Sequence, residues 1–583
     1  MRLKKITINN FRSIKNCSIN VGNLCALVGE NNVGKSSVLR ALNAFFNYED
    51  EKEDFDKGKH HYSSNTKPKI ELTFCDVPDK GHYRDKIVND ELTLQMIYPK
   101  SEEPKLNYKT ANRRYDNINI DFIDKMKQDI HFFLISNARD YTQAQIKQSE
   151  ETLLKKLLNH LLKEHTSGRD TISPKFHEAM KKMERSGFSK IQKNIEKYYS
   201  LSHDFKFKIS YDEGLDYSAF LNNISLGIID HETYFSLGEC GSGIQSMSII
   251  ALYRFLAHKK HTKFVLGIEE PETNLHPQSQ RELIKSIKRK DYDTNEIQMI
   301  FTTHSAVIAD QLDHNELVLF KRIPDEKRGF KTTCYQIPDN FYEKYGLDNF
   351  KYYQFYKYRN SEFFFAKFVI VVESKNDAEV VKKLLEQKKK DLDVLGVSII
   401  NLEGIDNLKY PYYLLKCLKL PYILILDKDF FVPYFNDKLD DSRYNSGFPK
   451  YRYEFKNNHL EIIRGLIEGE NDREKLLSLL KTNHSKALDL LEKYNIICFK
   501  YSLEVDLVNS GRAQKELYNV LKIPLEKQNT RELLVERKEM IKKPDILLQV
   551  LEELPNRNLP NSYKRIKNSV ERTSKNPNQY LIQ

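Results

Sequence analysis

Hydrophobic and polar residues at the start of the chain follow spacings that predict short strands followed by a helix. Polar and apolar positions alternate on either side of Asn9-Asn10, which predicts a β-hairpin. After the apolar run at 24–28, apolar residues recur at helical spacing, at Val38, Leu39, Leu42 and Phe45. The pattern predicts strands at residues 3–8, 17–21, 24–28, 69–74 and 92–97, and a helix at 37–46. An α/β fold follows.

A lysine-rich helical pattern interrupts this alternation at residues 142–200. Its lysines lie beside a series of leucines, which fits either an inserted dimerisation arm or a helical face packed on its own domain. Beyond it, the pattern predicts a helix at 244–258 and buried strands at 263–268 and 297–302.

A domain boundary is expected where an aromatic-rich segment gives way to a new strand–helix–strand pattern. The predicted parts are one α/β domain from residues 1–141 and 201–340, a helical insertion at 142–200, a linker at 341–367, and a second α/β domain with a C-terminal helical extension at 368–583.

Composition indicates a protein with buried cores and no membrane-spanning segment, and it bears on redox setting and charge. Hydrophobic residues make up 40% of the 583, so both domains can bury a core, and no apolar run is long enough to span a bilayer. The seven scattered cysteines exclude a zinc ribbon or a disulfide framework and predict a reducing, cytoplasmic setting. The net charge of +11 fits nucleic-acid binding and ordinary solubility equally well.

The loop after the strand at 24–28 predicts an ATP site. Gly29-Glu30-Asn31-Asn32-Val33-Gly34-Lys35-Ser36 matches GxxxxGK[ST] between a strand and a helix, where backbone N–H groups surround phosphate oxygens. Lys35 is expected to reach the β- and γ-phosphates, and Ser36 to bind Mg²⁺. The predicted nucleotide-binding residues in this loop are Gly29, Asn31, Asn32, Gly34, Lys35, Ser36 and Ser37.

Three downstream segments are expected to complete the ATP site. Glu269 and Glu270 end the strand at 263–268, where the first is assigned to Mg²⁺ and the second as general base. His304 follows the strand at 297–302 and is placed to sense the γ-phosphate. Ser242 and Gly243 open the helix at 244–258, and its amides form a second anion site.

These motifs resemble the ATPase heads of ABC proteins, in the branch shared with chromosome-maintenance and DNA-repair ATPases. The resemblance implies that Ser242 and Gly243 contact ATP bound to a partner head, and therefore a homodimer or larger homo-oligomer. The Glu-Glu-Pro-Glu run beginning at Glu269 departs from the Asp-Glu of most ABC proteins and matches a narrower group.

A second set of acidic residues follows the strands of the C-terminal domain. Glu373 and Asp377 follow the strand at 368–372, and Asp427 and Asp429 follow the strand at 422–426. Carboxyl ends of parallel strands meet at one sheet edge, so these four acids are expected to converge and bind Mg²⁺ or Mn²⁺. The pattern resembles a Toprim domain, although Ser374 stands where glycine is usual.

An ABC-type P-loop ATPase head with an inserted helical arm, followed by a Toprim α/β domain, resembles the OLD (overcoming lysogenization defect) family of ATP-dependent nucleases. The resemblance implies Glu504 as a further metal ligand, beside Asp506, and Lys543 as a catalytic lysine. It also implies DNA as substrate, a role in bacterial defence against phage, and a helicase-like protein (Gabija-type) or a retron reverse transcriptase with its DNA as partner.

Two other functions fit the same sequence. The first is an ATP-driven DNA clamp or sensor with a catalytically inactive Toprim domain. The second is a primase-like or topoisomerase-like enzyme, although none of the 34 tyrosines stands out as a nucleophile. Neither the sign of the ATP effect on cleavage nor the DNA preference follows from the sequence.

Overall fold

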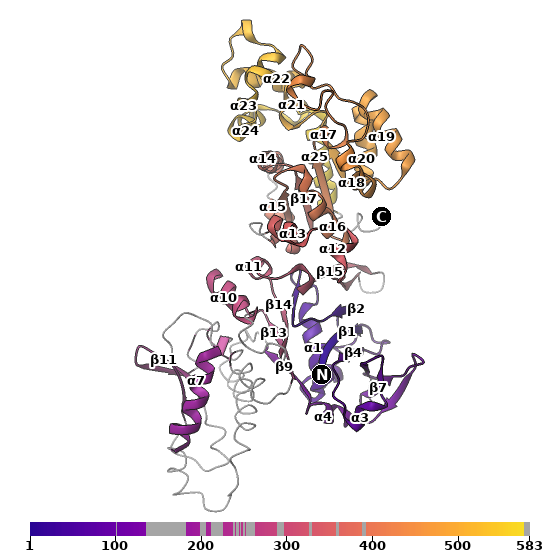
Figure 1. Cartoon of the computed structure of the whole chain (residues 1–583), viewed down its shortest axis with the longest axis vertical. Coiled ribbons are helices and arrows are strands. Elements are labelled where there is room, and N and C mark those ends of the chain that lie inside the picture. Colours follow the sequence, from indigo (N-terminus) through magenta and orange to yellow (C-terminus); the bar gives the residue numbers. More distant parts are fainter. Residues whose placement is uncertain are drawn as a thin grey trace, which may run out of the picture. The chain divides into compact units, whose positions relative to one another are not determined.

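The computed structural model divides into two compact units, Met1–Cys334 and Tyr335–Gln583 (Figure 1). It describes residues 1–100, 102–135, 182–198, 206–210, 225–236, 240, 244, 247–248, 251, 263–273, 275–288, 297–325, 329–356, 361–386 and 392–575. None of the described helices is long and apolar enough to cross a membrane.

The first unit is built on one large mixed sheet. The described strands are β1 (Arg2–Phe11), β2 (Ile14–Asn20), β3 (Leu24–Val28), β4 (Lys69–Cys75), β5 (Ile87–Val88), β6 (Glu91–Ile97), β7 (Lys105–Lys109), β8 (Tyr115–Ile118), β9 (Ile130–Ile135), β13 (Lys263–Glu269), β14 (Ile297–Thr302), β15 (Leu317–Asp325) and β16 (Gly329–Tyr335). Their order is β8-β7-β6-β4-β1-β2-β16-β15-β3-β14-β13-β9, and β5 pairs with β6. The central strands β15, β3, β14, β13 and β9 run parallel, which explains their continuous apolar runs.

Helix α1 (Lys35–Phe46) packs on this sheet through its buried face, including Val38, Leu39 and Leu42. The first hairpin forms, but its turn lies at Arg12-Ser13 and not at Asn9-Asn10, because the pairing continues to Phe11 opposite Ile14. Phe11 is fully buried, so its burial extends β1 beyond the two asparagines.

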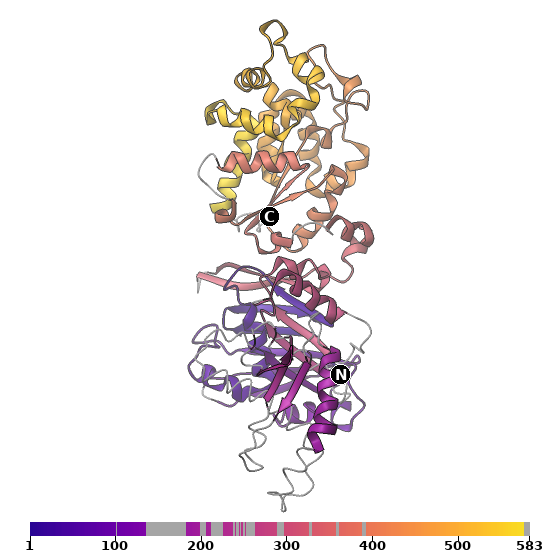
Figure 2. The ribbon, with the colours of Figure 1, turned by 90° about the vertical axis from the view of Figure 1, so that its left-hand side faces the viewer.

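The predicted helical insertion lies mostly outside the described residues. The described part contains helix α7 (Ser189–Tyr198), which packs against β10 (Lys206–Ser210), as Figure 2 shows. Strand β10 pairs with β11 (Ser225–Asp230), and β11 pairs with β12 (Thr233–Ser236). The dimerisation role of residues 142–200 stays a prediction, and most of the helix expected at 244–258 also lies outside the described residues.

The second unit holds a parallel sheet in the order β18-β17-β19-β20. The strands are β17 (Phe368–Val372), β18 (Val397–Asn401), β19 (Tyr422–Leu426) and β20 (Ile496–Cys498). Helices α14 (Lys375–Glu386) and α25 (Asn561–Lys575) pack against it, and α24 (Pro544–Glu553) packs against α14. Because all four strands are parallel, the residues after β17, β19 and β20 meet at one edge.

The aromatic-rich segment belongs to the second unit and is not the linker predicted at 341–367. It forms α12 (Phe341–Lys344) and α13 (Asn349–Tyr356), and the units divide earlier, between Cys334 and Tyr335. Tyr352 is fully buried, and the rings of Phe355 and Tyr410 lie 5.5 Å apart. The aromatic residues are therefore core of the second unit, in contact with α16 (Lys409–Cys417).

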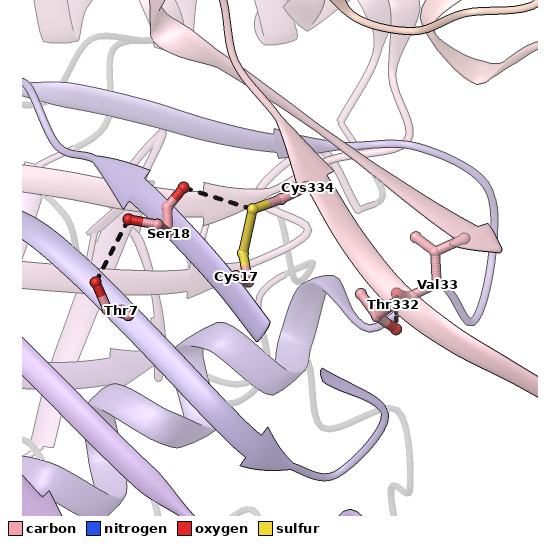
Figure 3. Close-up of a disulfide and its surroundings, with 6 residues drawn as sticks. All are labelled: Thr7, Cys17, Ser18, Val33, Thr332 and Cys334. Carbon is pink, nitrogen blue, oxygen red and sulfur yellow. Dashed lines mark hydrogen bonds between the residues drawn. A yellow bond between two sulfur atoms is a disulfide. The ribbon is translucent and has the colours of Figure 1, made fainter. Parts of the chain in front are cut away.

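A disulfide joins Cys17 of β2 to Cys334 of β16, across 317 residues of sequence (Figure 3). The spacing of the cysteines excluded a disulfide framework and did not predict this single cross-link. The proximity of Cys17 and Cys334 depends on the pairing of β16 with β2, which a scattered cysteine pattern does not reveal. Five cysteines form no disulfide with any described residue: Cys25, Cys75, Cys240, Cys417 and Cys498.

We expect Cys334→Ser to destabilise the first unit by about 2–4 kcal/mol, because the cross-link restricts the unfolded chain. Urea unfolding with and without reductant measures this, and reductant should have no further effect on the variant. Cys75→Ser, at a free thiol, is the matched control. Titration of seven thiols in the denatured, unreduced protein would contradict the disulfide.

Candidate ATP and metal sites

The P-loop connects β3 to α1 and forms one wall of a cavity of about 440 Å³. Gly29 has φ 135°, and an added Cβ would lie 2.3 Å from the Phe320 carbonyl oxygen. Gly34 has φ 98°, and an added Cβ would lie 2.6 Å from Ser13 Oγ. Only glycine satisfies both positions. The cavity is lined by Arg12, Ser13, Asn31, Asn32, Val33, Gly34, Lys35, Ser36, Ser37, Glu270 and His304.

Lys35 lies folded over the loop. Its Nζ donates to the carbonyl oxygens of Gly29, at 3.0 Å, and Glu30, at 2.8 Å. Burial lowers the pKa of Lys35 to about 8, against the raising effects of Glu270, Glu272 and Glu30. Phosphate oxygens would offer this ammonium stronger, charge-assisted partners than the two carbonyls.

Glu270 and His304 face each other on the same cavity. Their side chains approach to 3.7 Å, between His304 Nε2 and Glu270 Oε1. Glu270 has φ 45°, and its amide donates to Thr302 at the end of β14. This constrained backbone after β13 directs Glu270 to the cavity lining, whereas Glu269 does not line it.

Glu272 is a residue that the sequence reasoning missed. Its Oε1 accepts from the His304 backbone amide at 2.7 Å, and burial raises the pKa of its carboxyl. Its other oxygen, Oε2, is buried with no hydrogen-bond partner in the described residues. Glu272 therefore positions the backbone of His304. The sequence signal that could have identified Glu272 is its place in the acidic run, two residues after Glu270.

Arg12 and Ser13, also missed, line the cavity from the turn of the first hairpin. The loop is held from behind by Thr332 of β16, whose Oγ1 donates to the Val33 carbonyl at 2.7 Å (Figure 3). The Thr332 hydroxyl is also 2.8 Å from Ser13 Oγ. Ser242 and Gly243 lie outside the described residues, so their predicted contact with ATP stays a prediction.

The second cavity, of about 200 Å³, lies at the edge of the sheet in the second unit. Glu373 follows β17, Asp427 and Asp429 follow β19, and Glu504 begins α21 (Leu503–Val508) after β20. All four line the cavity. The remaining lining residues are Tyr434, Leu439, Arg443, Pro449, Tyr451, Ser502, Val505, Leu534, Lys538, Ile541 and Lys542.

These carboxylates repel one another in a buried setting. Burial, together with Asp429 and Asp377, raises the pKa of Glu373 to about 8, against the lowering effect of Lys456. Complete burial, and then Glu373, raises the pKa of Asp427 well above its ordinary value. Glu373 Oε2 is buried without a hydrogen-bond partner among the described residues. A divalent cation would satisfy this oxygen and neutralise the cluster, so the donor set fits Mg²⁺ or Mn²⁺.

Asp377 is near this cluster but does not line the cavity. Its Oδ2 accepts from both the amide and the hydroxyl of Ser374, each at 2.8 Å, at the start of α14. Ser374 is thus accommodated where Toprim domains usually have glycine, because its side chain closes the turn. The geometry gives Asp377 a turn-holding role, with its Oδ2 already occupied.

Glu504 and Asp506 have separate roles, although they are two residues apart. Glu504 lines the cavity, whereas Asp506 is buried and accepts from the backbone amides of Lys500 and Tyr501 and from Ser562 Oγ. Asp506 therefore fixes the loop that precedes Glu504.

Lys542, and not Lys543, lines the cavity. Asn376 of α14 donates to the Lys542 carbonyl at 2.7 Å, while Lys543 is the N-cap of α24. Lys538 also lines the cavity, but its Nζ is 3.0 Å from Asp440. No ion pair is recorded for Lys542 within the described part of the chain.

Comparisons with known proteins agree with this two-part architecture. Residues 1–152 and 130–309, together more than half the chain, match the AAA ATPase domain family, and residues 364–429 match the OLD-like Toprim domain. An OLD nuclease of Thermus scotoductus is 22% identical over 73% of this chain and 82% of its own length. An endonuclease GajA of Bacillus cereus is 23% identical over 69% of this chain and 71% of its own length.

Among solved structures, an Smc head bound to the C-winged helix domain of ScpA matches with 13% identity and a TM-score of 0.40. The match covers 59% of this chain and 100% of that one. The fold class is the one predicted, a mixed α/β ATPase head followed by a parallel Toprim sheet. With an AAA ATPase domain and an OLD-like Toprim domain in sequence, the chain belongs to the OLD family of ATP-dependent nucleases.

Proposed function

We propose that this protein is a metal-dependent DNA endonuclease whose activity is regulated by ATP. The observation that carries the proposal is a cavity lined by four acids, Glu373, Asp427, Asp429 and Glu504. One carboxylate oxygen of this set, Glu373 Oε2, is buried and has no hydrogen-bond partner among the described residues. The names of the two relatives, a nuclease and an endonuclease, support the reaction class.

The cavity carboxylates would hold two divalent ions, which when bound supply Lewis-acid charge and a deprotonated water. Glu373 and Asp427 are the proposed central ligands, with Asp429 and Glu504 beside them. Asp377 contributes by shaping the turn after β17. The Lys456 ammonium opposes the rise in the pKa of Glu373 and of Asp429, so it stabilises their ionised forms and offsets part of the negative charge of the cluster.

Lys542 takes the catalytic role that the sequence assigned to Lys543. A lysine on the cavity wall is placed to stabilise charge that develops on the scissile phosphate. The Asn376 hydrogen bond connects its backbone to the helix that follows Glu373, so the lysine and the first metal ligand are held together.

We expect Lys542→Ala to reduce DNA cleavage on the order of a hundredfold, because one charge-stabilising group is lost. Lys543→Ala is the matched control, one residue away and outside the cavity, and should keep near-normal activity. Initial rates of plasmid cleavage in Mg²⁺ or Mn²⁺ measure both. Equal losses in the two variants, or a larger loss for Lys543→Ala, would contradict the assignment.

In the first unit, we propose that ATP with Mg²⁺ binds the P-loop cavity, where Ser36 serves the metal, Glu270 is the general base and His304 senses the γ-phosphate. Glu269, which ends β13 and does not line the cavity, would serve the metal through water. Ser242 and Gly243 would complete the site of a second head, so the active form would be a homodimer or larger. Light scattering after size-exclusion chromatography tests this. A monomer both with and without ATP would contradict it.

The proposed biological role is defence against phage in the cytoplasm, alone or with a helicase-like protein or a retron reverse transcriptase. Plating of phage on cells that express wild type or Glu373→Gln tests this role.

Cleavage of plasmid and linear DNA with Mg²⁺ or Mn²⁺, with and without ATP, tests the activity itself. A metal-stimulated cleavage that survives both Glu373→Ala and Asp427→Ala would refute the nuclease assignment and favour a clamp or sensor.

A further inference from the structure

Residues 433–453, called here the aromatic loop, follow Asp427 and Asp429 in the sequence, just after the short helix α17 (Lys428–Phe431). The loop is held in a compact form by two isolated β-bridges, Tyr434 with Tyr451 and Arg443 with Pro449. All four of these residues line the carboxylate cavity. The inner side of the aromatic loop is therefore part of the cavity wall.

Three aromatic rings of the aromatic loop are exposed to solvent. Phe435 and Tyr444 are each 54% exposed, and Tyr453 is 37% exposed. Backbone hydrogen bonds fix their positions: the Phe435 amide donates to the Lys450 carbonyl at 3.0 Å, and the Tyr444 amide to the Phe448 carbonyl at 2.9 Å. Three large exposed rings on one short, hydrogen-bonded loop indicate a surface that binds another molecule.

One exposed ring, Tyr453, shares an ammonium group with a ring of the cavity wall: Lys428 Nζ lies 4.9 Å from the centroid of the Tyr451 ring and 5.1 Å from that of Tyr453. Tyr434, in the cavity wall, stacks on Tyr451 with ring centroids 5.3 Å apart. Tyr451 lies 6.5 Å from Tyr501, which packs on Phe448 at 5.2 Å. Burial raises the pKa of Tyr453, and nearby Tyr444 adds to the rise, so the two exposed tyrosines are neighbours.

Ammonium groups accompany the rings. Lys450 Nζ lies 4.6 Å from the centroid of the Tyr444 ring, and Lys481 Nζ lies 6.0 Å from that of Tyr453. Neither lysine has a recorded ion pair with a carboxylate within the described part of the chain. From the buried side, Lys428 Nζ lies 5.1 Å from the Tyr453 ring and donates to the Leu480 carbonyl, which fixes that ring from beneath.

Rings that alternate with ammonium groups match a nucleic-acid strand with exposed bases, because bases stack on the rings and phosphates pair with the lysines. An intact duplex does not match, since its base faces are covered by neighbouring base pairs. We propose that the aromatic loop binds single-stranded DNA on Tyr444, Tyr453 and Phe435 and directs it to the carboxylate cavity. This inference rests on the proposed nuclease function and names its substrate class: DNA with unpaired nucleotides, such as a free strand, a flap or a melted region.

The test uses the full chain in a chelator, which prevents cleavage, and measures fluorescence anisotropy of labelled DNA. The probes are an oligothymidine of about 20 nucleotides, a duplex of the same length, and a strand with abasic sites, since a bound strand covers about 4–16 nucleotides per site. Wild type should bind the oligothymidine at least about tenfold more tightly than the duplex, and lose that advantage on the abasic strand.

The variant Tyr444→Ala/Tyr453→Ala should lose about tenfold or more in affinity for oligothymidine, since both stacking rings are removed. Tyr444→Phe/Tyr453→Phe keeps the rings and should bind within about twofold of wild type. Phe350→Ala, at a ring 76% exposed elsewhere in the second unit, is the surface control. Equal wild-type affinity for strand and duplex, or unchanged binding by the alanine variant, would overturn the inference, the latter pointing to a protein partner for the loop.

A cleavage assay with Mn²⁺ separates this inference from the proposed function. Single-strand preference without any cleavage would refute the nuclease function and leave the binding surface standing. Cleavage with no single-strand preference would refute the aromatic-loop inference and leave the nuclease function intact.

Discussion

Asp427→Asn should abolish metal-dependent DNA cleavage, with a rate loss on the order of 10³ or more, because a central metal ligand is lost. The same change should stabilise the metal-free protein. Asp427 is fully buried, and its charge is opposed by burial and by Glu373, Asp377, Asp429 and Glu504. An amide of the same shape removes that repulsion, so the unfolding temperature without metal should rise by about 2–4 °C for each kcal/mol gained.

Scanning calorimetry with EDTA, Mg²⁺ or Mn²⁺ measures the stability effect, and plasmid cleavage measures the rate. Metal should raise the unfolding temperature of wild type and have little effect on Asp427→Asn. Glu526→Gln, which removes an exposed carboxylate of the same unit, is the control and should change neither quantity. An Asp427→Asn protein that is destabilised without metal would contradict the repulsive cluster.

Lys35→Ala should weaken ATP binding on the order of a hundredfold and remove ATP hydrolysis, because the ammonium that meets the phosphates is lost. The fold should tolerate the change, since among the described residues Lys35 Nζ donates only to the carbonyls of Gly29 and Glu30 in the same loop. Equilibrium binding of a fluorescent ATP analogue and phosphate release measure the two effects. Lys57→Ala, at an exposed lysine of the same unit, is the control.

Glu270→Gln separates binding from hydrolysis at the same cavity: it should keep ATP binding and lose turnover. Cleavage by wild type, Lys35→Ala and Glu270→Gln, each with and without ATP, then gives the sign of the regulation. If ATP activates, Lys35→Ala falls below wild type; if ATP inhibits, it exceeds wild type when ATP is present. Full hydrolysis by Glu270→Gln would move the general base to another residue.

The sequence predicted the parts of both sites that depend on local spacing. The P-loop lies between a buried strand and a helix, and the acids after β17, β19 and β20 meet because parallel strands end at one sheet edge. The strand at 263–269 and Glu270 at its end were likewise readable, because a continuous apolar run followed by acids is a local pattern.

The residues that were missed depend on contacts between distant segments. Lys542 and Lys543 are adjacent and chemically identical, and the one that lines the cavity is the one whose carbonyl accepts from Asn376, 166 residues away in sequence. Cys17 and Cys334 meet only because β16 returns to pair with β2. The aromatic segment at 341–367 was predicted to be a linker from its place between two predicted domains, and its packing against Tyr410 makes it core.

The hydroxyl of Thr332 connects the nucleotide loop to the segment that leads into the second unit. Thr332 donates to Val33 in the P-loop, and Tyr335, three residues later, is the first residue of the second unit. An ATP-dependent displacement of the Val33 carbonyl would therefore act directly on Thr332, three residues before the second unit begins. A connection of this kind would run through one hydrogen bond and then along the backbone, so it would not depend on contacts between the two units.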